Sequence, residues 1–177
     1  MAIYTKTGDK GITRIFDKKT GELVKISKTS CKIASIGAID ELNSFLGMVG
    51  GEEEMQGNLF TINSILAGSN LRFSKSKTKK LEKEIDKLEG TLPVLKNFIY
   101  YGGSPKASLL FYARALCRKA ERELVAFFNI QHTSPDILAY VNRLSDYLFM
   151  KAREQNFKDG IKEKVWKRQP YSYVTMI

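Results

Sequence analysis

The stretch SPKASLLFYARALCRKAERELVAFF, residues 104–128, decides the fold of this chain. Its first two residues, Ser104 and Pro105, are typical of a helix start, because a serine hydroxyl caps free N–H groups and proline fits the first turn. Apolar side chains then recur at three- and four-residue steps, which predicts one long helix with a single buried face. That face consists of Leu109, Ala113, Leu116, Ala120, Leu124 and Phe127.

The same helical period continues on both sides of this stretch, with glycine or proline where each pattern stops. The first 30 residues differ, because they are rich in Gly, Lys and Thr and hold only short β-prone pieces near 12–16 and 23–26. The sequence therefore predicts an all-α fold, a five-helix up-and-down bundle behind a short irregular N-terminal segment. The other four helices are expected at about 36–49, 55–71, 77–89 and 135–156.

A chain of 177 residues suits a single domain, here residues 1–177. We expect a nucleotide-binding segment at 1–30, the bundle at 31–157 and a basic tail at 158–177, which is either draped over the surface or an oligomer contact. The start lacks the pattern of a secretory signal, and no apolar run is long enough to cross a membrane, so we expect a cytoplasmic protein without a membrane partner. Two distant cysteines and one histidine match no zinc spacing, so no metal site on the protein is predicted.

The net charge of +10 favours anionic partners: nucleic acid, a membrane surface or a small polyanion such as ATP. Arg114, Arg118 and Arg122 follow one another at four-residue steps, beside the apolar face of the 104–128 helix. Such a row can hold phosphate oxygens with forked donors. It can equally form exposed pairs with neighbouring glutamates. Spacing alone leaves both interpretations open.

A second candidate is the segment Thr5–Gly11, TKTGDKG. Two glycines three residues apart allow a tight loop whose N–H groups converge beside threonine and lysine side chains. The segment lacks the spacing of a Walker A loop, and a simple turn is the alternative interpretation. Asp40 and Asn142 lie beside apolar helical stripes, and a half-buried carboxylate needs a cation, which an arginine of the 104–128 helix could supply. No cluster of two acids and a histidine is present, which disfavours a hydrolase.

Four segments in order carry a resemblance to a known family: IYTKTGDKG at 3–11, GAIDELN at 37–43, FIYYGGS at 98–104 with ARALCRKAER at 113–122, and YVNRLSDYLF at 140–149. Together they resemble the PduO-type ATP:cob(I)alamin (corrinoid) adenosyltransferases. The resemblance implies a helical bundle that forms a homotrimer with active sites between subunits. It also implies transfer of the 5′-deoxyadenosyl group of ATP to the cobalt of cob(I)alamin with release of triphosphate, and Mg²⁺ that shares the phosphate charge. A reductase and an adenosylcobalamin-dependent acceptor enzyme are the implied partners.

The resemblance also assigns residues. It implies that Asp40 and Arg114 form a salt bridge across the subunit interface, that Arg118 is catalytic, and that Phe98 packs near the corrin and helps to displace its lower axial ligand. Its implied nucleotide-binding residues are Thr5, Lys6, Thr7, Gly8, Thr13, Arg14, Lys28, Arg118, Lys119, Ala120, Glu121, Arg122 and Asn142.

Three positions depart from the family pattern. Tyr100 and Tyr101 stand where Leu-Pro is usual, which affects the local turn and the packing near the corrin. Lys119 stands where a second arginine is usual, which keeps the charge but loses the two-pronged donor. Two other functions stay open at this point: a carrier that binds adenosylcobalamin without chemistry, and a basic helical nucleic-acid-binding module. The second has no recognised nucleic-acid-binding motif to support it.

Overall fold

A computed structural model describes residues 4, 6–131 and 134–167. This part of the chain contains five helices preceded by an antiparallel β-hairpin, so the predicted all-α bundle is confirmed. The strands are β1 (Ile12–Asp17) and β2 (Glu22–Ser27), and the helices are α1 (Cys31–Val49), α2 (Glu53–Leu66), α3 (Lys75–Thr91), α4 (Pro105–Phe128) and α5 (Pro135–Lys158).

Helix α4 has the predicted bounds, whereas α2 does not. The hydroxyl of Ser104 accepts a hydrogen bond from the N–H of Ala107 (3.3 Å), which caps α4 as expected. The prediction of a helix at 55–71 was wrong at its C-terminal end, because the chain turns at Gly68 and the hairpin docks there. The Phe16 N–H donates to the Ala67 carbonyl (3.2 Å), and a Cβ on Gly68 (φ +109°) would lie 2.1 Å from the Phe16 oxygen. Only glycine fits this contact.

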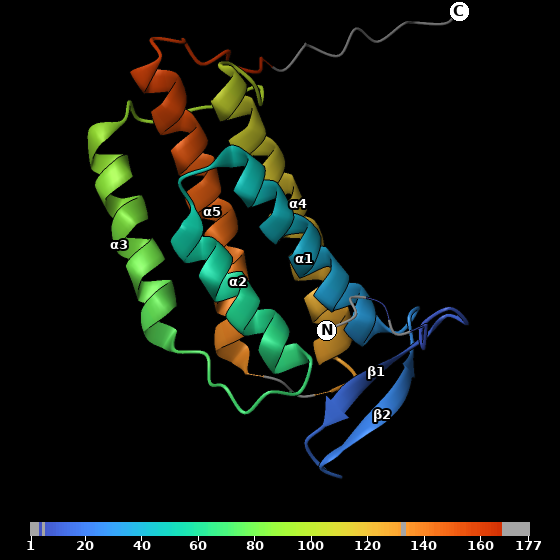
Figure 1. Ribbon diagram of the computed structural model, residues 1–177. Coiled ribbons are helices and arrows are strands. Elements are labelled where there is room, and N and C mark those ends of the chain that lie inside the picture. The colour runs from blue at the N-terminus through green and yellow to red at the C-terminus, as the bar shows by residue number, and fades with distance from the viewer. Residues whose placement is uncertain (1–3, 5, 132–133, 168–177) are drawn as a thin grey trace, which may run out of the picture.

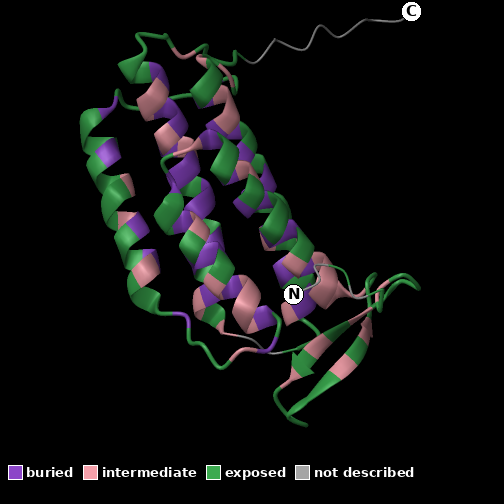
Figure 2. Cartoon of the chain, in the orientation of Figure 1, coloured by how far each residue is buried: buried purple, intermediate pink, exposed green. Residues whose placement is uncertain are grey.

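The helices form two layers, with α1 and α2 in front of α4 and α5, and α3 beside α5 (Figure 1). Helices α1 and α4 are antiparallel neighbours, and the Ser35 hydroxyl donates to the Glu123 carbonyl (2.9 Å). Between α2 and α5, the amide of Asn58 donates to the Tyr140 hydroxyl (3.0 Å). Buried residues, purple in Figure 2, recur along all five helices.

The chain after α5 returns across the end of the bundle that is far from the hairpin (Figure 1). There it pairs with the connection between α3 and α4: Ile99 opposes Val165, the Tyr100 N–H donates to the Lys164 carbonyl (2.9 Å) and the Trp166 N–H to the Phe98 carbonyl (2.8 Å). Up to residue 167, the tail therefore covers the surface, one of its two predicted forms. The rest of the tail and the single histidine, at position 132, lie outside the described residues. None of the described helices is long and apolar enough to span a membrane.

Candidate functional site

Helices α4 and α5 pack against each other, and α4 carries several of the charged residues that the sequence singled out. The amide of Asn142 on α5 donates to the Glu121 carboxylate on α4 (2.7 Å). The Cys117 thiol on α4 is fully buried and donates to the Val141 carbonyl on α5 (3.2 Å). Its pKa is raised, first by burial and then by the charges of Glu121 and Asp146, and the charges of Arg118 and Arg114 oppose the rise. Charges from both helices, which are far apart in sequence, thus act on the Cys117 thiol.

An aromatic cleft of about 740 Å³ lies between α3, α4, α5 and the connection that joins α3 to α4. Its lining includes Phe98, Tyr101, Phe149 and Arg114. The Arg114 guanidinium carbon lies 5.2 Å from the Tyr101 ring centre and 5.5 Å from the Phe149 ring centre, a cation–π arrangement. Its buried Nε has no hydrogen-bond partner in the described part of the chain. Tyr101 also stacks on Phe111, with ring centres 5.2 Å apart, so this departure from the family pattern builds one wall of the cleft.

The other two arginines that line the cleft are already ion-paired. Arg143 contacts Asp146 (2.7 Å) on its own helix and Glu82 (3.4 Å) on α3. Arg153 is only 4% exposed, and its Nε lies 2.6 Å from the Glu163 carboxylate. Arg143 and Arg153 are thus neutralised within the chain, whereas Arg114 lines the cleft without an ion pair to a carboxylate among the described residues.

The predicted nucleotide motif 118–122 is divided between opposite sides of α4. Arg118 and Arg122 are exposed, and an Arg122 N–H donates to the Arg118 carbonyl (3.1 Å). Ala120 is fully buried and therefore contributes packing. Lys119 points to α1, where it pairs with Glu41 (2.7 Å), and its hydrogen bond to that carboxylate raises the pKa of Lys119. Lys119 therefore already has a partner inside the chain.

The N-terminal loop closes on the end of β2. The Gly11 N–H donates to the Gly8 carbonyl (3.3 Å), and the Lys28 N–H donates to the Gly11 carbonyl (2.9 Å). The Lys28 side chain crosses the loop, because its Nζ would lie 3.2 Å from a Cβ on Gly8. Glycine at position 8 thus leaves the lysine ammonium next to the loop backbone, an arrangement suited to an anion.

The hairpin places the remaining predicted residues of this segment. Arg14 is exposed on β1 opposite Lys25, whereas Thr13 faces the other side and is half-buried. Lys6 is exposed beside the loop, with its Nζ 5.7 Å from the Tyr4 ring centre. Thr7 is exposed as well, and Thr5 lies outside the described residues.

The two halves of the predicted phosphate site lie on different elements of the fold. The loop lies before α1 and contacts Lys28, whereas Arg118 and Arg122 lie on α4 next to α5. Asp40 is exposed on α1 and has no ion pair within the described ranges, and Arg114 is enclosed by aromatic rings in the cleft. Sequence reasoning missed those rings and the contact of Trp166 with Phe98, because both depend on chain segments that meet only in the folded structure.

The arrangement places exposed cations and one wall of an aromatic cleft on the same helix, α4. A sequence model of the cobalamin adenosyltransferase family matches residues 3–155. The chain belongs to this family. It is 38% identical to the corrinoid adenosyltransferase of Bacillus subtilis (strain 168), over 95% of this chain and 93% of that protein. It is 35% identical to the human corrinoid adenosyltransferase MMAB, over 93% of this chain and 72% of that protein.

Solved structures agree with this assignment. The fold superposes with a TM-score of 0.87 on a variant of the PduO-type ATP:corrinoid adenosyltransferase from Lactobacillus reuteri, complexed with cobalamin and ATP. The two sequences are 32% identical, and the match covers 94% of this chain and 100% of that chain. A second variant of the same enzyme, complexed with ATP, superposes with a TM-score of 0.85 at 34% identity. The five-helix bundle with its N-terminal segment is therefore the fold of this enzyme family.

Proposed function

We propose that the protein transfers the 5′-deoxyadenosyl group of ATP to the cobalt of cob(I)alamin or a related corrinoid, releasing triphosphate. The observations that carry this proposal are the aromatic cleft, which Arg114 lines, and the arginine row, Arg118 and Arg122, which is exposed further along the same helix α4. In the reaction the electron pair of Co(I) forms the Co–C5′ bond, and the C5′–O bond breaks with its electrons on triphosphate. Because Co(I) is already a strong nucleophile, the protein needs to supply orientation and charge rather than a general base.

On the nucleotide side, we propose that the exposed Arg118 and Arg122 bind the triphosphate together with Asn142 and the N-terminal loop. Forked guanidinium donors match phosphate oxygens and stabilise the charge that grows on the leaving group. In this scheme residues 1–30 are the nucleotide-binding segment of one domain that also contains the bundle. The loop and hairpin contribute Thr5, Lys6, Thr7, Gly8, Thr13, Arg14 and Lys28.

Mg²⁺ in this proposal is held chiefly by the triphosphate. The described residues contain no group of three or more Asp, Glu, His or Cys side chains that could ligate a metal. Mg²⁺ commonly binds substrate phosphates with few protein ligands, so this side-chain set fits a metal that arrives with ATP. The ion would neutralise part of the phosphate charge that the arginines also contact.

On the corrinoid side, we propose that the aromatic cleft holds the corrin ring. Phe98 is 78% exposed at the cleft, and Tyr101 and Phe149 provide further apolar surface. An aromatic ring placed against the lower face of the corrin excludes the lower axial ligand and so makes the cobalt easier to reduce. Phe98 is the residue best placed for this role, because its side chain is not buried in the core of the protein.

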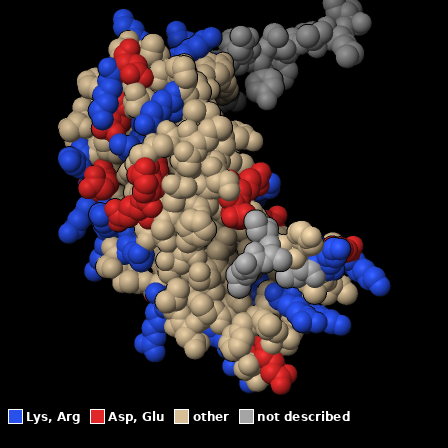
Figure 3. Space-filling model, in the orientation of Figure 1, with Lys and Arg blue, Asp and Glu red and all other residues tan. Residues whose placement is uncertain are grey.

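We further propose a homotrimer whose active sites lie between subunits. The loop and the arginine row belong to different elements of the fold, and we propose that a second copy brings a loop to each arginine row. A band without charged side chains runs down the α1–α2 face in Figure 3, and Met48 and Phe60 on these helices are 63% and 61% exposed. Such a face suits subunit contact. In the trimer, exposed Asp40 pairs with Arg114 of a neighbouring copy.

The assay that tests the reaction uses ATP, Mg²⁺ and chemically reduced cobalamin under anaerobic conditions. We expect adenosylcobalamin and triphosphate in equal amounts, and neither product when the cobalamin is left oxidised. A carrier would bind adenosylcobalamin but release no triphosphate. A nucleic-acid-binding protein would instead bind DNA with an affinity that falls steeply with salt. We place the enzyme in the cytoplasm, between a reductase that supplies Co(I) and an acceptor enzyme that uses the product.

A further inference from the structure

Residues 163–167, which we name the strap, form a short antiparallel pair with residues 98–100. The Trp166 N–H donates to the Phe98 carbonyl (2.8 Å), and the Tyr100 N–H donates to the Lys164 carbonyl (2.9 Å). Between these two bonds Ile99 opposes Val165. The backbone that carries Phe98 is therefore held by the strap rather than by a neighbouring helix.

Side chains alternate across this pair, as in any antiparallel ladder. Ile99 points inward and is buried, whereas Phe98 and Tyr100 point outward. On the outward side the Phe98 and Trp166 rings meet edge to face, with centres 6.5 Å apart and planes at 76°. The next outward pair is Lys164 over Tyr100, with the ammonium 5.2 Å from the ring centre. Trp166 is thus the cross-strand partner of Phe98.

A buried ion pair fixes both strands of this arrangement to α5. The guanidinium of Arg153 binds the Glu163 carboxylate through Nε (2.6 Å) and Nη2 (3.1 Å), and Nη2 also donates to the Pro93 carbonyl (2.7 Å). Glu163 begins the strap, and Pro93 lies at the start of the connection that leads to Phe98. One guanidinium therefore sets the distance between the strap and the segment that it supports.

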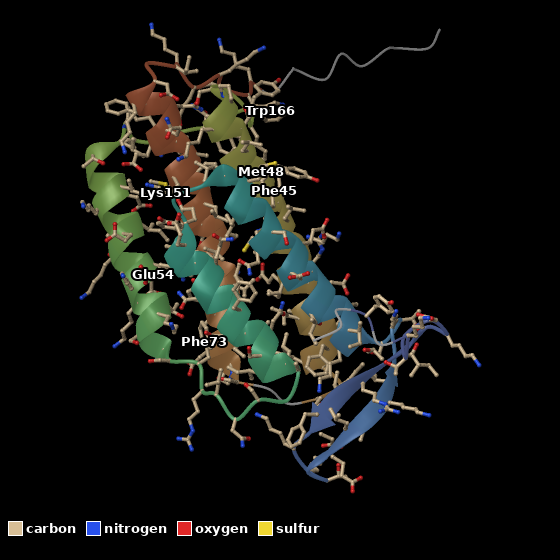
Figure 4. All side chains as sticks on the ribbon, in the orientation of Figure 1. Phe45, Met48, Glu54, Phe73, Lys151 and Trp166 are labelled. Atoms are coloured by element: carbon tan, nitrogen blue, oxygen red, sulfur yellow. The ribbon has the colours of Figure 1, made fainter. Side chains whose placement is uncertain are left out.

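Trp166 lies behind Phe98 as seen from the cleft. Phe98 lines both the cleft and a neighbouring hollow of about 690 Å³. Trp166 lines that hollow and is not among the described residues that line the cleft. In Figure 4 Trp166 lies at the end of the bundle where α4 begins. Because Phe98 is highly exposed, the Trp166 ring is the contact that opposes rotation of its side chain out of the cleft.

We propose that Trp166 is a positioning residue for the corrinoid reaction: it holds the Phe98 ring against the corrin, and the Arg153–Glu163 pair holds the strap in place. The inference rests on the proposed role of Phe98 and adds to it a residue outside the cleft. Trp166 contacts neither substrate in this scheme and acts through Phe98.

The test replaces Trp166 and measures both substrates. In W166A we expect kcat/KM for the corrinoid to fall about 10-fold, because a small misplacement of a contact group is costly, while the KM for ATP stays within about 2-fold. The electron paramagnetic resonance spectrum of bound cob(II)alamin should show a smaller fraction with the lower axial ligand displaced. W166F keeps a ring at this position and should restore much of both signals. K164A, which alters the neighbouring cross-strand pair, serves as the matched control and should leave both unchanged.

A double-mutant cycle with F98A separates positioning from general stability. W166A should add nothing in the F98A background, since its effect passes through that ring. If W166A folds poorly, E163Q replaces it as the test. E163Q loosens the strap without removing a ring, and it should lower the corrinoid kcat/KM and the fraction of displaced lower ligand less than W166A would. An impaired F98A beside a W166A with normal corrinoid kinetics and spectrum would overturn this inference alone. A fully active F98A would overturn both this inference and the role proposed for Phe98.

Discussion

The aromatic cleft and the arginine row both include residues of α4, but their cations differ in whether they are ion-paired within the chain. Around the cleft, Arg143 and Arg153 are ion-paired inside the chain. One turn beyond Arg114, Arg118 and Arg122 are exposed, and neither has an ion pair within the described ranges. Burying a cation is costly unless a partner inside the chain neutralises it, whereas an exposed cation is solvated by water and stays available to bind an anionic ligand. In the proposed scheme Arg114 of the cleft is paired by Asp40 of a neighbouring copy, and Arg118 and Arg122 are paired by the phosphates of ATP.

The largest expected effect concerns two adjacent residues of the motif. Arg118→Ala should lower kcat/KM for ATP about 100-fold, because it removes a forked donor from the leaving group. Lys119→Ala should lower it no more than about 3-fold, since Lys119 faces Glu41 on α1 in an exposed pair. Steady-state kinetics at saturating corrinoid measure both. Equal losses in the two variants would contradict the proposal that Arg118 binds phosphate and that Lys119, which faces α1, does not.

A smaller effect on ATP binding is expected from the proposed contact between Asp40 of one copy and Arg114 of the next. Asp40→Asn should weaken ATP binding about 10-fold, because it removes the partner proposed for Arg114 of the neighbouring subunit. Light scattering should show a loss of trimer at low protein concentration in parallel with the loss of ATP affinity. Asp159→Asn changes an exposed carboxylate at the end of α5 and is a control. An Asp40→Asn variant that remains trimeric and fully active would contradict the pairing.

Removing the Lys28 side chain from the N-terminal loop should weaken the use of ATP by a similar or smaller factor. Lys28→Ala should raise the KM for ATP about 5-fold, because a charge-assisted bond to phosphate is lost from the loop. The KM for the corrinoid should not change, since Lys28 is far from the cleft along the chain and in its contacts. Lys25→Ala, on the same strand, provides the matched control. A rise in both KM values would show that the loop and the cleft are not separate in function.

The smallest effect is on stability and should leave both regions active. Glu52 is 5% exposed and accepts a hydrogen bond from the Tyr147 hydroxyl (3.2 Å). Burial raises the pKa of Glu52 above 4.5, although Lys151, the Tyr147 bond and Lys106 oppose the rise. A raised folded-state pKa means that the stability gained from this group is complete below pH 4.5 and is lost as the pH rises through the folded value.

Glu52→Gln should therefore raise Tm by about 2 °C at neutral pH, since the buried group no longer ionises. The gain over the unmodified protein should shrink as the pH approaches 4.5. Thermal unfolding followed by circular dichroism at several pH values measures this. A variant that is less stable at neutral pH would show that the lysines around Glu52 outweigh its burial.

The sequence predicts the fold well where local signals decide it. Helix α4 begins and ends as predicted, because the cap, the proline and the apolar period all lie within the helix itself. The end of α2 could not be predicted in this way, because the hairpin that docks at Gly68 is distant in sequence. The spacing of apolar residues predicts which face of a helix is buried, but it does not predict which other segment of the chain packs on that face.

The candidate site shows the same division. Residues such as Arg118 and Phe98 were found through their motif, but Lys119 lies about 100° around the helix from Arg118, and only the packing of α1 shows that it points elsewhere. The roles of Tyr101 and Trp166 depend on ring contacts with Phe111 and Phe98 that no local pattern encodes. The proposed meeting of the loop and the arginine row across two copies of the chain is likewise not encoded in any local pattern.

The central claim is that the two regions bind two different substrates, and a crossed binding measurement tests it most directly. Calorimetric titration of Arg118→Ala and Phe98→Ala with ATP, and then with cob(II)alamin at saturating ATP, gives four affinities to compare with the unmodified protein. We predict that Arg118→Ala loses at least about 10-fold in ATP affinity and keeps its corrinoid affinity, and that Phe98→Ala does the reverse. Equal losses for both substrates in both variants would contradict the division of the site into a phosphate region and a corrin region.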